Sequence, residues 1–250
     1  MSEPVFKDHF SGRSDAYAAR RPTYPAALVD WLANVSPGRD LVLDAGCGTG
    51  QLSTLLARRF RRVVATDASA GQIAAAAPAE GVSFRVAPAQ ASGLPGASAD
   101  LVTVAQAAHW FDLDPFYAEA RRVLRPGGVV ALITYGILEI DDAIDPVFGH
   151  IYGAVAGPYW PPERRHVEDR YRSLPFPFAE IAPPPLAIEV AWDLEDLVGY
   201  IDTWSALRAA EKALGESPLP AARAALAAVW GDPATRRTMR FPLSVRAGRA

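Results

Sequence analysis

The chain has 250 residues, half of them apolar, with a formal net charge of −3 and one cysteine. This length suits one α/β domain with a sizeable core. The slight negative charge argues against a nucleic-acid or anionic-membrane surface, which needs concentrated basic residues, and a lone cysteine excludes an intramolecular disulfide framework and a cysteine-built zinc site.

Short valine-rich runs alternate with alanine-rich stretches between about 25 and 135. The expected strands span residues 41–46, 62–67, 82–87, 100–105 and 129–135. Strands that are apolar throughout indicate a sheet covered on both faces, and therefore parallel strands joined by helical crossovers. The pattern predicts an α/β fold with an open, doubly wound, mostly parallel sheet. Asp67 and Asp112 stand where helix N-caps are wanted.

Proline-rich sequence interrupts this pattern after Tyr135. Residues 140–186 contain GPYWPPERR and LPFPFAEIAPPP, where prolines remove amide donors and favour turns. We expect an irregular and helical insertion or lid there. Strand-like alternation returns at 186–192, and the rest predicts helices followed by a last strand at 238–247.

The first expected strand runs into a glycine-rich turn, VLDAGCGTG at 42–50. In an open parallel sheet, ligands bind beyond the carboxyl ends of the strands where the strand order reverses, and this turn usually lies there. Glycines at 46, 48 and 50 permit positive φ and a close approach of backbone to ligand. The alternative is a tight turn that only packs helix on strand. Gln51 stands where the dinucleotide fingerprint has its third glycine, which disfavours a pyrophosphate ligand.

Two acidic residues add a charge preference. Asp44 directly precedes the glycine-rich loop, where it suits a cationic amino group better than a pyrophosphate. Asp67 ends the next strand and can accept hydrogen bonds from both hydroxyls of a ribose, with a helix cap as its alternative role. A sulfonium amino acid joined to a nucleoside fits both, so S-adenosylmethionine is the predicted cofactor.

LDAGCGTGQ, ATD, PAQASGLP and RVLRPGGVVAL together resemble the motifs of class I S-adenosylmethionine-dependent methyltransferases. FSGRSDAYAARRPTYP, VTVAQAAHWFD and GYIDTWSAL resemble, more narrowly, a group that includes trans-aconitate methyltransferase and carries the methyltransferase type 11 domain. The resemblance implies a seven-stranded Rossmann-like sheet, methyl transfer to a small-molecule acceptor, and no metal.

The resemblance also implies a set of cofactor contacts, carried over position by position. Asp44, Ala45, Gly46 and Gly48 would hold the methionine part, Asp67 the ribose, Ala68 one side of the adenine, and Ala89 and Gln90 its edge. Tyr17 and Arg21 could close over the cofactor carboxylate, Arg21 by a charge-assisted hydrogen bond. The alternative for both residues is an N-terminal segment that simply packs on the sheet.

Methyl transfer is an in-line displacement that depends on positioning and on exclusion of water. The stretch AQAAHWFD at 105–112 follows the fourth expected strand and would face this chemistry. Gln106 would begin the loop over the sulfonium. His109 could act as a general base, orient the acceptor or merely pack, and Trp110 could line the acceptor cavity or anchor the next helix.

An anionic acceptor would need cationic partners, since an unpaired buried carboxylate is costly. Arginines at 164, 165, 170 and 172 could supply them, or could be ordinary surface charge. The family resemblance and these arginines together make carboxyl O-methylation the first hypothesis for the acceptor. Two other functions stay open: a nicotinamide-dependent oxidoreductase on the same kind of sheet, and a protein that binds S-adenosylmethionine without turnover.

We expect one domain over residues 1–250, because no repeat or linker divides it. Its expected parts are an N-terminal cofactor-covering segment (1–38), a cofactor-binding core (39–135), the insertion or lid (136–186), and C-terminal helices with the last strand (187–250). No signal peptide or membrane-spanning run is visible, so a cytoplasmic protein without membrane or nucleic-acid partners is expected. Paired strand edges or helix faces could form a homodimer.

Overall fold

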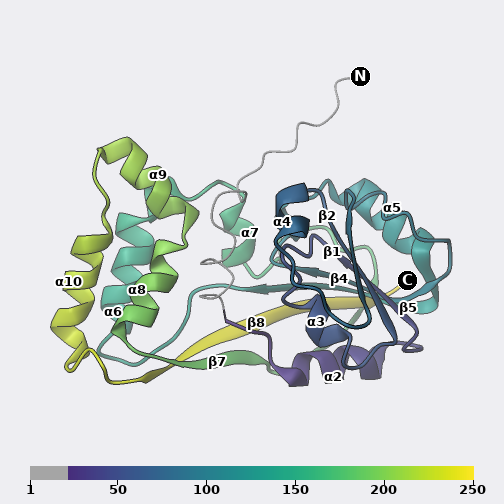
Figure 1. The fold of residues 1–250 in the computed structure, drawn as a ribbon, viewed down its shortest axis with the longest axis horizontal. Coiled ribbons are helices and arrows are strands. Elements are labelled where there is room, and N and C mark those ends of the chain that lie inside the picture. Colours follow the sequence, from purple (N-terminus) through teal and green to yellow (C-terminus); the bar gives the residue numbers. More distant parts are fainter. Residues whose placement is uncertain (1–21) are drawn as a thin grey trace.

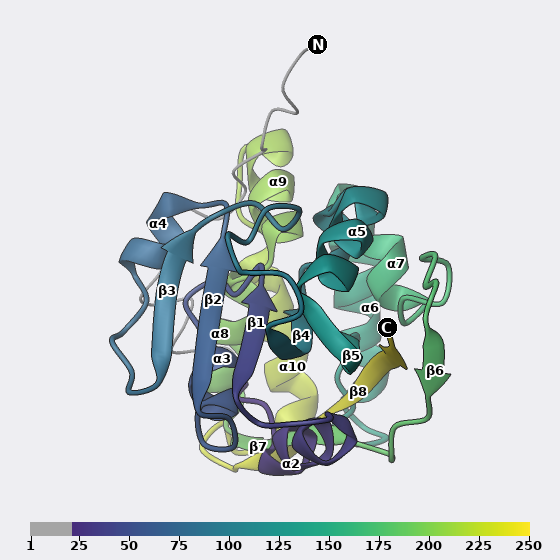
Figure 2. The same ribbon diagram turned by 90° about the vertical axis from the view of Figure 1, so that its right-hand side faces the viewer.

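An eight-stranded sheet runs through residues 22–250, the part of the chain that this computed structural model describes. The strands are β1 (Leu41–Ala45), β2 (Arg62–Asp67), β3 (Val82–Val86), β4 (Ala99–Ala105), β5 (Leu124–Tyr135), β6 (Ala179–Ile181), β7 (Ala187–Trp192) and β8 (Arg237–Arg249). Figure 2 shows the order β3-β2-β1-β4-β5-β8-β6, and β7 pairs with β8 outside this row. Strands β1 to β5 pair in parallel, whereas β8 is antiparallel to its three neighbours. The predicted doubly wound, mostly parallel sheet is confirmed.

Helices cover both faces of this sheet. The helices within residues 22–250 are α2 (Ala26–Val35), α3 (Ser53–Leu56), α4 (Ala70–Ala74), α5 (Leu113–Val123), α6 (Asp145–His150), α7 (Arg164–Glu168), α8 (Leu194–Asp202), α9 (Ser205–Leu214) and α10 (Leu219–Trp230). Successive residues of β1 enter different cores: Val42 packs in one with Leu28 of α2, and Leu43 packs in the other with Phe116 of α5. A strand alternates its side chains between faces, so burial of both faces explains the continuous apolar runs.

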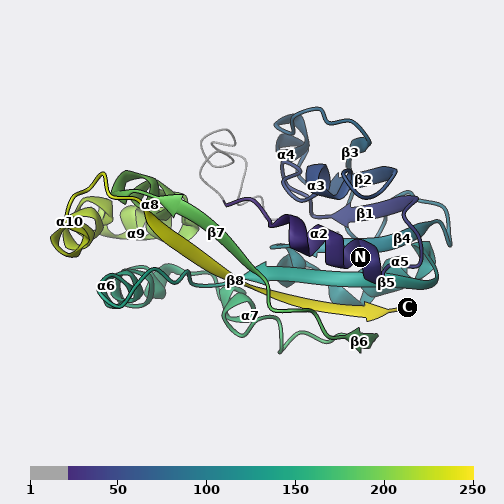
Figure 3. The same cartoon turned by 90° about the horizontal axis from the view of Figure 1, so that it is seen from below.

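Strand β8 connects the sheet to a second group of helices. Its residues 243–249 pair with β5, and residues 237–242 continue beyond the end of β5 to pair with β7. Figures 1 and 3 show this long yellow strand reaching α8, α9 and α10, with α6 beside them. Tyr200 and Trp204 of this region are buried among aromatic rings and pack in the core.

The proline-rich segment forms short elements, as the spacing of its prolines predicts. Besides α6, α7 and β6 it contains a π-helical turn, η2 (Ile151–Val155), and a 3-10 turn, η3 (Gly157–Tyr159). Strand β6 was not predicted, because three residues are too few to show an alternating pattern, yet it forms an edge of the sheet by pairing with β8. No helix within residues 22–250 has the length and apolar character needed to cross a membrane.

Candidate functional site

A crevice of about 800 Å³ lies at the carboxyl ends of β1, β2 and β4. The strand order reverses between β1 and β4, which is where open α/β sheets bind ligands. Ten predicted site residues line it: Asp44, Gly46, Gly48, Asp67, Ala68, Ala89, Gln90, Gln106, His109 and Trp110. Ala45 does not, because its side chain is fully buried in β1. Tyr17 and Arg21 lie outside the described residues.

Two of the three glycines in the turn are required by packing within the protein. Gly46 has a φ of +66°, and a Cβ there would lie 2.8 Å from the Cβ of Ala107. Gly50 has a φ of +86°, and a Cβ there would lie 2.5 Å from the ring of Phe84. The purely structural role considered for this turn therefore accounts for Gly46 and Gly50, and ligand contact is not needed to explain them.

Asp44 is buried, with only 1% of the residue exposed, and it is among the residues that line the crevice. Its carboxylate accepts hydrogen bonds from the hydroxyls of Ser53 at 2.6 Å and Thr103 at 2.8 Å. Burial raises the pKa of Asp44 to about 6; the two hydroxyls oppose this rise, and the charge of Asp67 adds to it. The carboxylate thus joins β1, β4 and the start of α3 beneath the glycine turn.

Asp67 accepts hydrogen bonds from two backbone amides, that of Gly48 at 2.9 Å and that of Ser69 at 2.8 Å. The predicted cap role of Asp67 is wrong: Ser69 is the N-cap of α4, and its hydroxyl accepts from the amide of Gln72. Asp112 does occupy the N-cap position of α5, though its side chain makes no capping hydrogen bond. Each oxygen of Asp67 keeps a further lone pair for a ligand.

The loop that carries Ala89 and Gln90 is anchored by a buried carboxylate, which pairs with a half-exposed arginine. Glu119 of α5 accepts hydrogen bonds from the amide and hydroxyl of Ser92 and forms an ion pair with Arg122. Hydrogen bonding from Arg122 lowers the pKa of Glu119 to about 2; burial opposes the shift and Ser92 supports it. The crevice wall beside Gln90 therefore depends on an ionised carboxylate.

This ion pair predicts acid-sensitive stability. The folded-state pKa of Glu119 lies below its ordinary value of 4.5, so its contribution is complete above pH 4.5 and is lost as pH falls towards 2. Because the side chain of Arg122 is 46% exposed, solvent screens the pair, and we expect this loss to be on the order of 1 kcal/mol. Denaturant unfolding at pH 5.5 and pH 3 measures it. The variant Glu119→Gln should be less stable at pH 5.5 and lose less on acidification; an unchanged acid loss would contradict the role of Glu119.

The AQAAHWFD stretch also lines the crevice, with every residue except the buried Ala108. His109 and Trp110 lie in a 3-10 turn, η1 (Ala108–Trp110), and their ring centroids are 4.7 Å apart. The Nδ1 of His109 lies 2.9 Å from the phenol oxygen of Tyr171. Burial lowers the pKa of His109 to about 3, with the charges of Arg164 and His166 adding to the shift. The imidazole is therefore neutral at physiological pH.

The charges around the crevice differ from those expected for an anionic acceptor. Its acidic lining residues are Asp44, Asp67, Asp112 and Glu163, and within residues 22–250 no lysine or arginine lines it. Arg164 instead stacks on Trp160, with its guanidinium carbon 4.7 Å from the ring centroid, and donates to the hydroxyl of Tyr152. The described wall therefore favours cationic or uncharged ligands.

Several lining residues were missed by the sequence analysis. Tyr135 ends β5 at the same sheet edge, a position from which it could have been found. Tyr24 precedes α2, and Pro161 to Glu163 come from the irregular segment, where no periodicity indicates which side chains turn inward.

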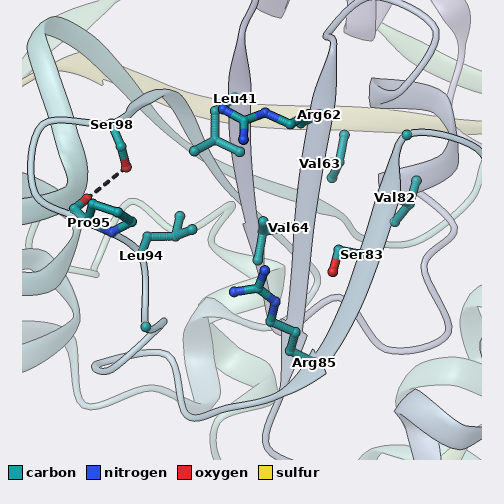
Figure 4. Close-up of a pocket in the computed structure, with 12 residues that line it drawn as sticks. Leu41, Arg62, Val63, Val64, Val82, Ser83, Arg85, Leu94, Pro95 and Ser98 are labelled. Atoms are coloured by element: carbon teal, nitrogen blue, oxygen red, sulfur yellow. Dashed lines mark hydrogen bonds between the residues drawn. The ribbon is translucent and has the colours of Figure 1, made fainter.

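A second hollow, of about 440 Å³, lies away from the carboxyl edge (Figure 4). It includes the first residues of β1, β2 and β3, which are Leu41, Arg62 and Val82, and the loop around Pro95. Its lining, all within the described part of the chain, contains no acidic residue, histidine or cysteine. It offers no group for the predicted chemistry, so the crevice is the candidate site.

The known proteins that this chain resembles in sequence and structure are described as methyltransferases. Residues 43–132 match the family described as a methyltransferase domain. A Dictyostelium discoideum protein named as a methyltransferase is 34% identical over 88% of this chain and 87% of its own length. A Mycobacterium tuberculosis protein named as an uncharacterized methyltransferase is 40% identical over 50% of this chain and 51% of its own. A structure from Anaeromyxobacter dehalogenans, described as a type II methyltransferase, is 48% identical with a TM-score of 0.88, covering 92% of this chain and 97% of that one.

Proposed function

This chain belongs to the class I S-adenosylmethionine-dependent methyltransferases, and from that membership we propose that its crevice binds S-adenosylmethionine for methyl transfer to a small-molecule acceptor. One observation carries the proposal. The glycine turn, Asp44 and Asp67 meet in a single crevice at the reversal of strand order. The narrower grouping with trans-aconitate methyltransferase stays a prediction.

The residues present fit this cofactor. Asp67 retains lone pairs for the ribose hydroxyls, and the negative charges of the wall suit a ligand with an ammonium and a sulfonium group. A volume of about 800 Å³ leaves room beyond the cofactor for a small acceptor, since ligand pockets commonly span about 300–1,000 Å³. When bound, the cofactor supplies a methyl group on positively charged sulfur. Trp110 and Phe111 line the crevice and would exclude water there.

The acceptor class is a separate part of the proposal. Carboxyl O-methylation requires a cation beside the acceptor, because a buried unpaired carboxylate is costly. Arg164 stacks on Trp160 instead, and Arg21 lies outside the described residues. The described wall supports an uncharged acceptor better than a carboxylate. A panel of acids, alcohols, phenols, amines and thiols with methyl-labelled S-adenosylmethionine tests this choice.

Calorimetry with S-adenosylhomocysteine tests the cofactor. We expect binding that strengthens between pH 5 and pH 7.5 by up to about tenfold. At pH 5, about one unit below the pKa of Asp44, only about a tenth of the molecules carry the charge. The physical reason is that the pKa of Asp44 is about 6, so its carboxyl group is mostly neutral at pH 5 and charged at pH 7.5. Only the charged form attracts the ligand's ammonium group.

Two variants separate this effect from general acid sensitivity. Asp44→Asn should abolish the change in affinity with pH, whereas Asp112→Asn, which removes another carboxylate of the crevice, should retain it. Absence of binding by the unmodified chain at both pH values would refute the proposed function. Binding without a pH effect would refute only the role of Asp44.

A further inference from the structure

The side chain of Tyr135, the last residue of β5, carries a hydroxyl that the fold places in the crevice without using it. The residue is 4% exposed, and it lines the crevice. Within residues 22–250 this hydroxyl makes no hydrogen bond, and it is not one of the side-chain atoms that are sealed from solvent without a partner. The hydroxyl therefore reaches the open space of the crevice.

Two aromatic neighbours fix the direction of the Tyr135 ring. The rings of Tyr24 and Phe241 pack against it in T-shaped contacts, with centroid distances of 6.3 Å and 5.5 Å. Such contacts are a preferred arrangement of aromatic pairs. The backbone carbonyl of Tyr135 is held as well, because the side-chain amide of Gln106 donates to it at 3.0 Å. Ring and backbone are both fixed, so the hydroxyl has one position from which to meet a ligand.

Neighbouring polar side chains at the ends of β4 and β5 are bonded within the protein. Besides donating to the Tyr135 carbonyl, the amide of Gln106 accepts from the hydroxyl of Thr134 at 2.7 Å. The Nδ1 of His109 lies 2.9 Å from the hydroxyl of Tyr171. The hydroxyl of Tyr135 differs from these groups because its hydrogen-bonding capacity is left for a ligand.

The order of the strands places Tyr135 on the acceptor side of the crevice. Strands β2, β1, β4 and β5 lie side by side in that order (Figure 2). Asp67 ends β2, Asp44 lies near the end of β1, and Tyr135 ends β5. Neighbouring strands are about 4.8 Å apart, so Tyr135 stands roughly 10 Å from Asp44 across the sheet. Asp67 and Asp44 are the proposed cofactor contacts, and the strand two places beyond them is therefore available to the acceptor.

The rest of the crevice wall suits an uncharged acceptor with an apolar body. Trp110, Pro161 and Pro162 line the crevice and offer flat apolar surfaces. Beyond the cofactor contacts, its acidic lining residues are Asp112 and Glu163, which would repel a carboxylate. A neutral hydroxyl avoids this repulsion, and the phenol of a tyrosine can both donate a hydrogen bond to it and accept one from it.

We propose that Tyr135 is a specificity-determining residue for the acceptor, and that its hydroxyl hydrogen-bonds to the hydroxyl group of an uncharged acceptor molecule. A site built to hydrogen-bond a hydroxyl rejects an analogue that lacks it, because the polar group of the protein is then left without a partner. The acceptor class rests on the proposed function. The presentation of the Tyr135 hydroxyl in the crevice does not.

Calorimetry with S-adenosylhomocysteine tests on which side of the crevice Tyr135 acts. Tyr135→Phe removes the hydroxyl and keeps the ring with its two T-shaped contacts, and thermal unfolding reports that the variant is folded. We expect its affinity to stay within about threefold of the unmodified chain, since the cofactor does not use this hydroxyl. A larger loss would assign the hydroxyl to the cofactor and overturn the proposal. Failure of the unmodified chain to bind would instead refute the proposed function.

Fluorine NMR tests the acceptor on the full chain saturated with S-adenosylhomocysteine. The tyrosines are labelled as 3-fluorotyrosine, and Tyr135→Phe identifies the signal of Tyr135. We expect benzyl alcohol to shift this signal, whereas toluene and benzoate at the same concentration leave it in place. No shift with benzyl alcohol, or an equal shift with either analogue, would overturn the proposal. If S-adenosylhomocysteine does not bind, the same titration of the ligand-free chain decides whether the hydroxyl meets a ligand in the crevice.

The contribution of the hydroxyl is measured by the affinity for benzyl alcohol, followed by ligand-detected NMR. Tyr135→Phe should bind it about threefold to tenfold more weakly, or about 0.7–1.4 kcal/mol, as expected for one neutral hydrogen bond. Tyr117→Phe is the matched control, because Tyr117 is 2% exposed and its hydroxyl donates to the Pro175 carbonyl instead of reaching the crevice. With an acceptor that turns over, Tyr135→Phe should raise KM by the same factor and change kcat less. An unchanged affinity for benzyl alcohol in Tyr135→Phe would overturn the proposal.

Discussion

Replacing Asp67 with alanine should weaken binding of S-adenosylhomocysteine by roughly 100-fold. Hydrogen bonds to a charged group contribute about 1.5–3 kcal/mol each, and about 1.4 kcal/mol corresponds to a factor of ten. Asp67 lies at the end of β2 in the crevice wall, where its free lone pairs can accept the ribose hydroxyls. Calorimetry at pH 7.5 measures the affinity, and thermal unfolding of the same samples reports whether the variant is folded.

The control for Asp67 addresses its second role. Its carboxylate also holds the amides of Gly48 and Ser69, so the variant could lose affinity because the turn moves. Ser69→Ala removes the N-cap of α4, at a cost of about 1 kcal/mol, and leaves the carboxylate in place. We expect this variant to bind within about threefold of the unmodified chain. Equal losses in both variants would show that Asp67 acts by holding the turn.

The parallel strands could be predicted because both of their faces are buried. Val42 and Leu43 enter separate cores on opposite sides of β1, so no polar position interrupts the run. The length of the helix after the glycine turn was less predictable: within residues 51–60 only Ser53–Leu56 form α3. Its sequence favours helix throughout, yet the chain must turn back to start β2 at Arg62.

The site residues that stand at the ends of predicted strands could be placed from the sequence. Asp44 and Asp67 each end a strand, and parallel strands bring their carboxyl ends to one edge. The burial of Asp44 was not predictable, because one of its two partners, Thr103, lies on β4, 59 residues along the chain. Tyr171 was out of reach for another reason. It belongs to an irregular segment, and its backbone has a positive φ although it is not a glycine, so the sequence gives no sign of the turn there. In the structure its hydroxyl lies 2.9 Å from the Nδ1 of His109.

Replacing Gly50 with alanine should cost about 3 kcal/mol of stability and lower the unfolding temperature by roughly 6–12 °C, since each kcal/mol shifts a chain of this size by about 2–4 °C. Two terms add. The left-handed backbone, with a φ of +86°, costs alanine roughly 1–2 kcal/mol relative to glycine. Its Cβ would also lie 2.5 Å from the ring of Phe84, and such overpacking typically costs about 1–3 kcal/mol.

The two terms can be measured separately. Gly127 has a φ of +76°, and a Cβ there would have no atom within 4 Å, so Gly127→Ala should show the backbone cost alone. Combining Gly50→Ala with Phe84→Leu should recover part of the loss, because the smaller side chain makes room, and a double-mutant cycle gives the coupling. If Gly50→Ala lowers the free energy of unfolding no more than Gly127→Ala does, the ring of Phe84 moves aside without a packing cost. The third glycine of the turn would then be needed for its backbone conformation and not for packing against β3.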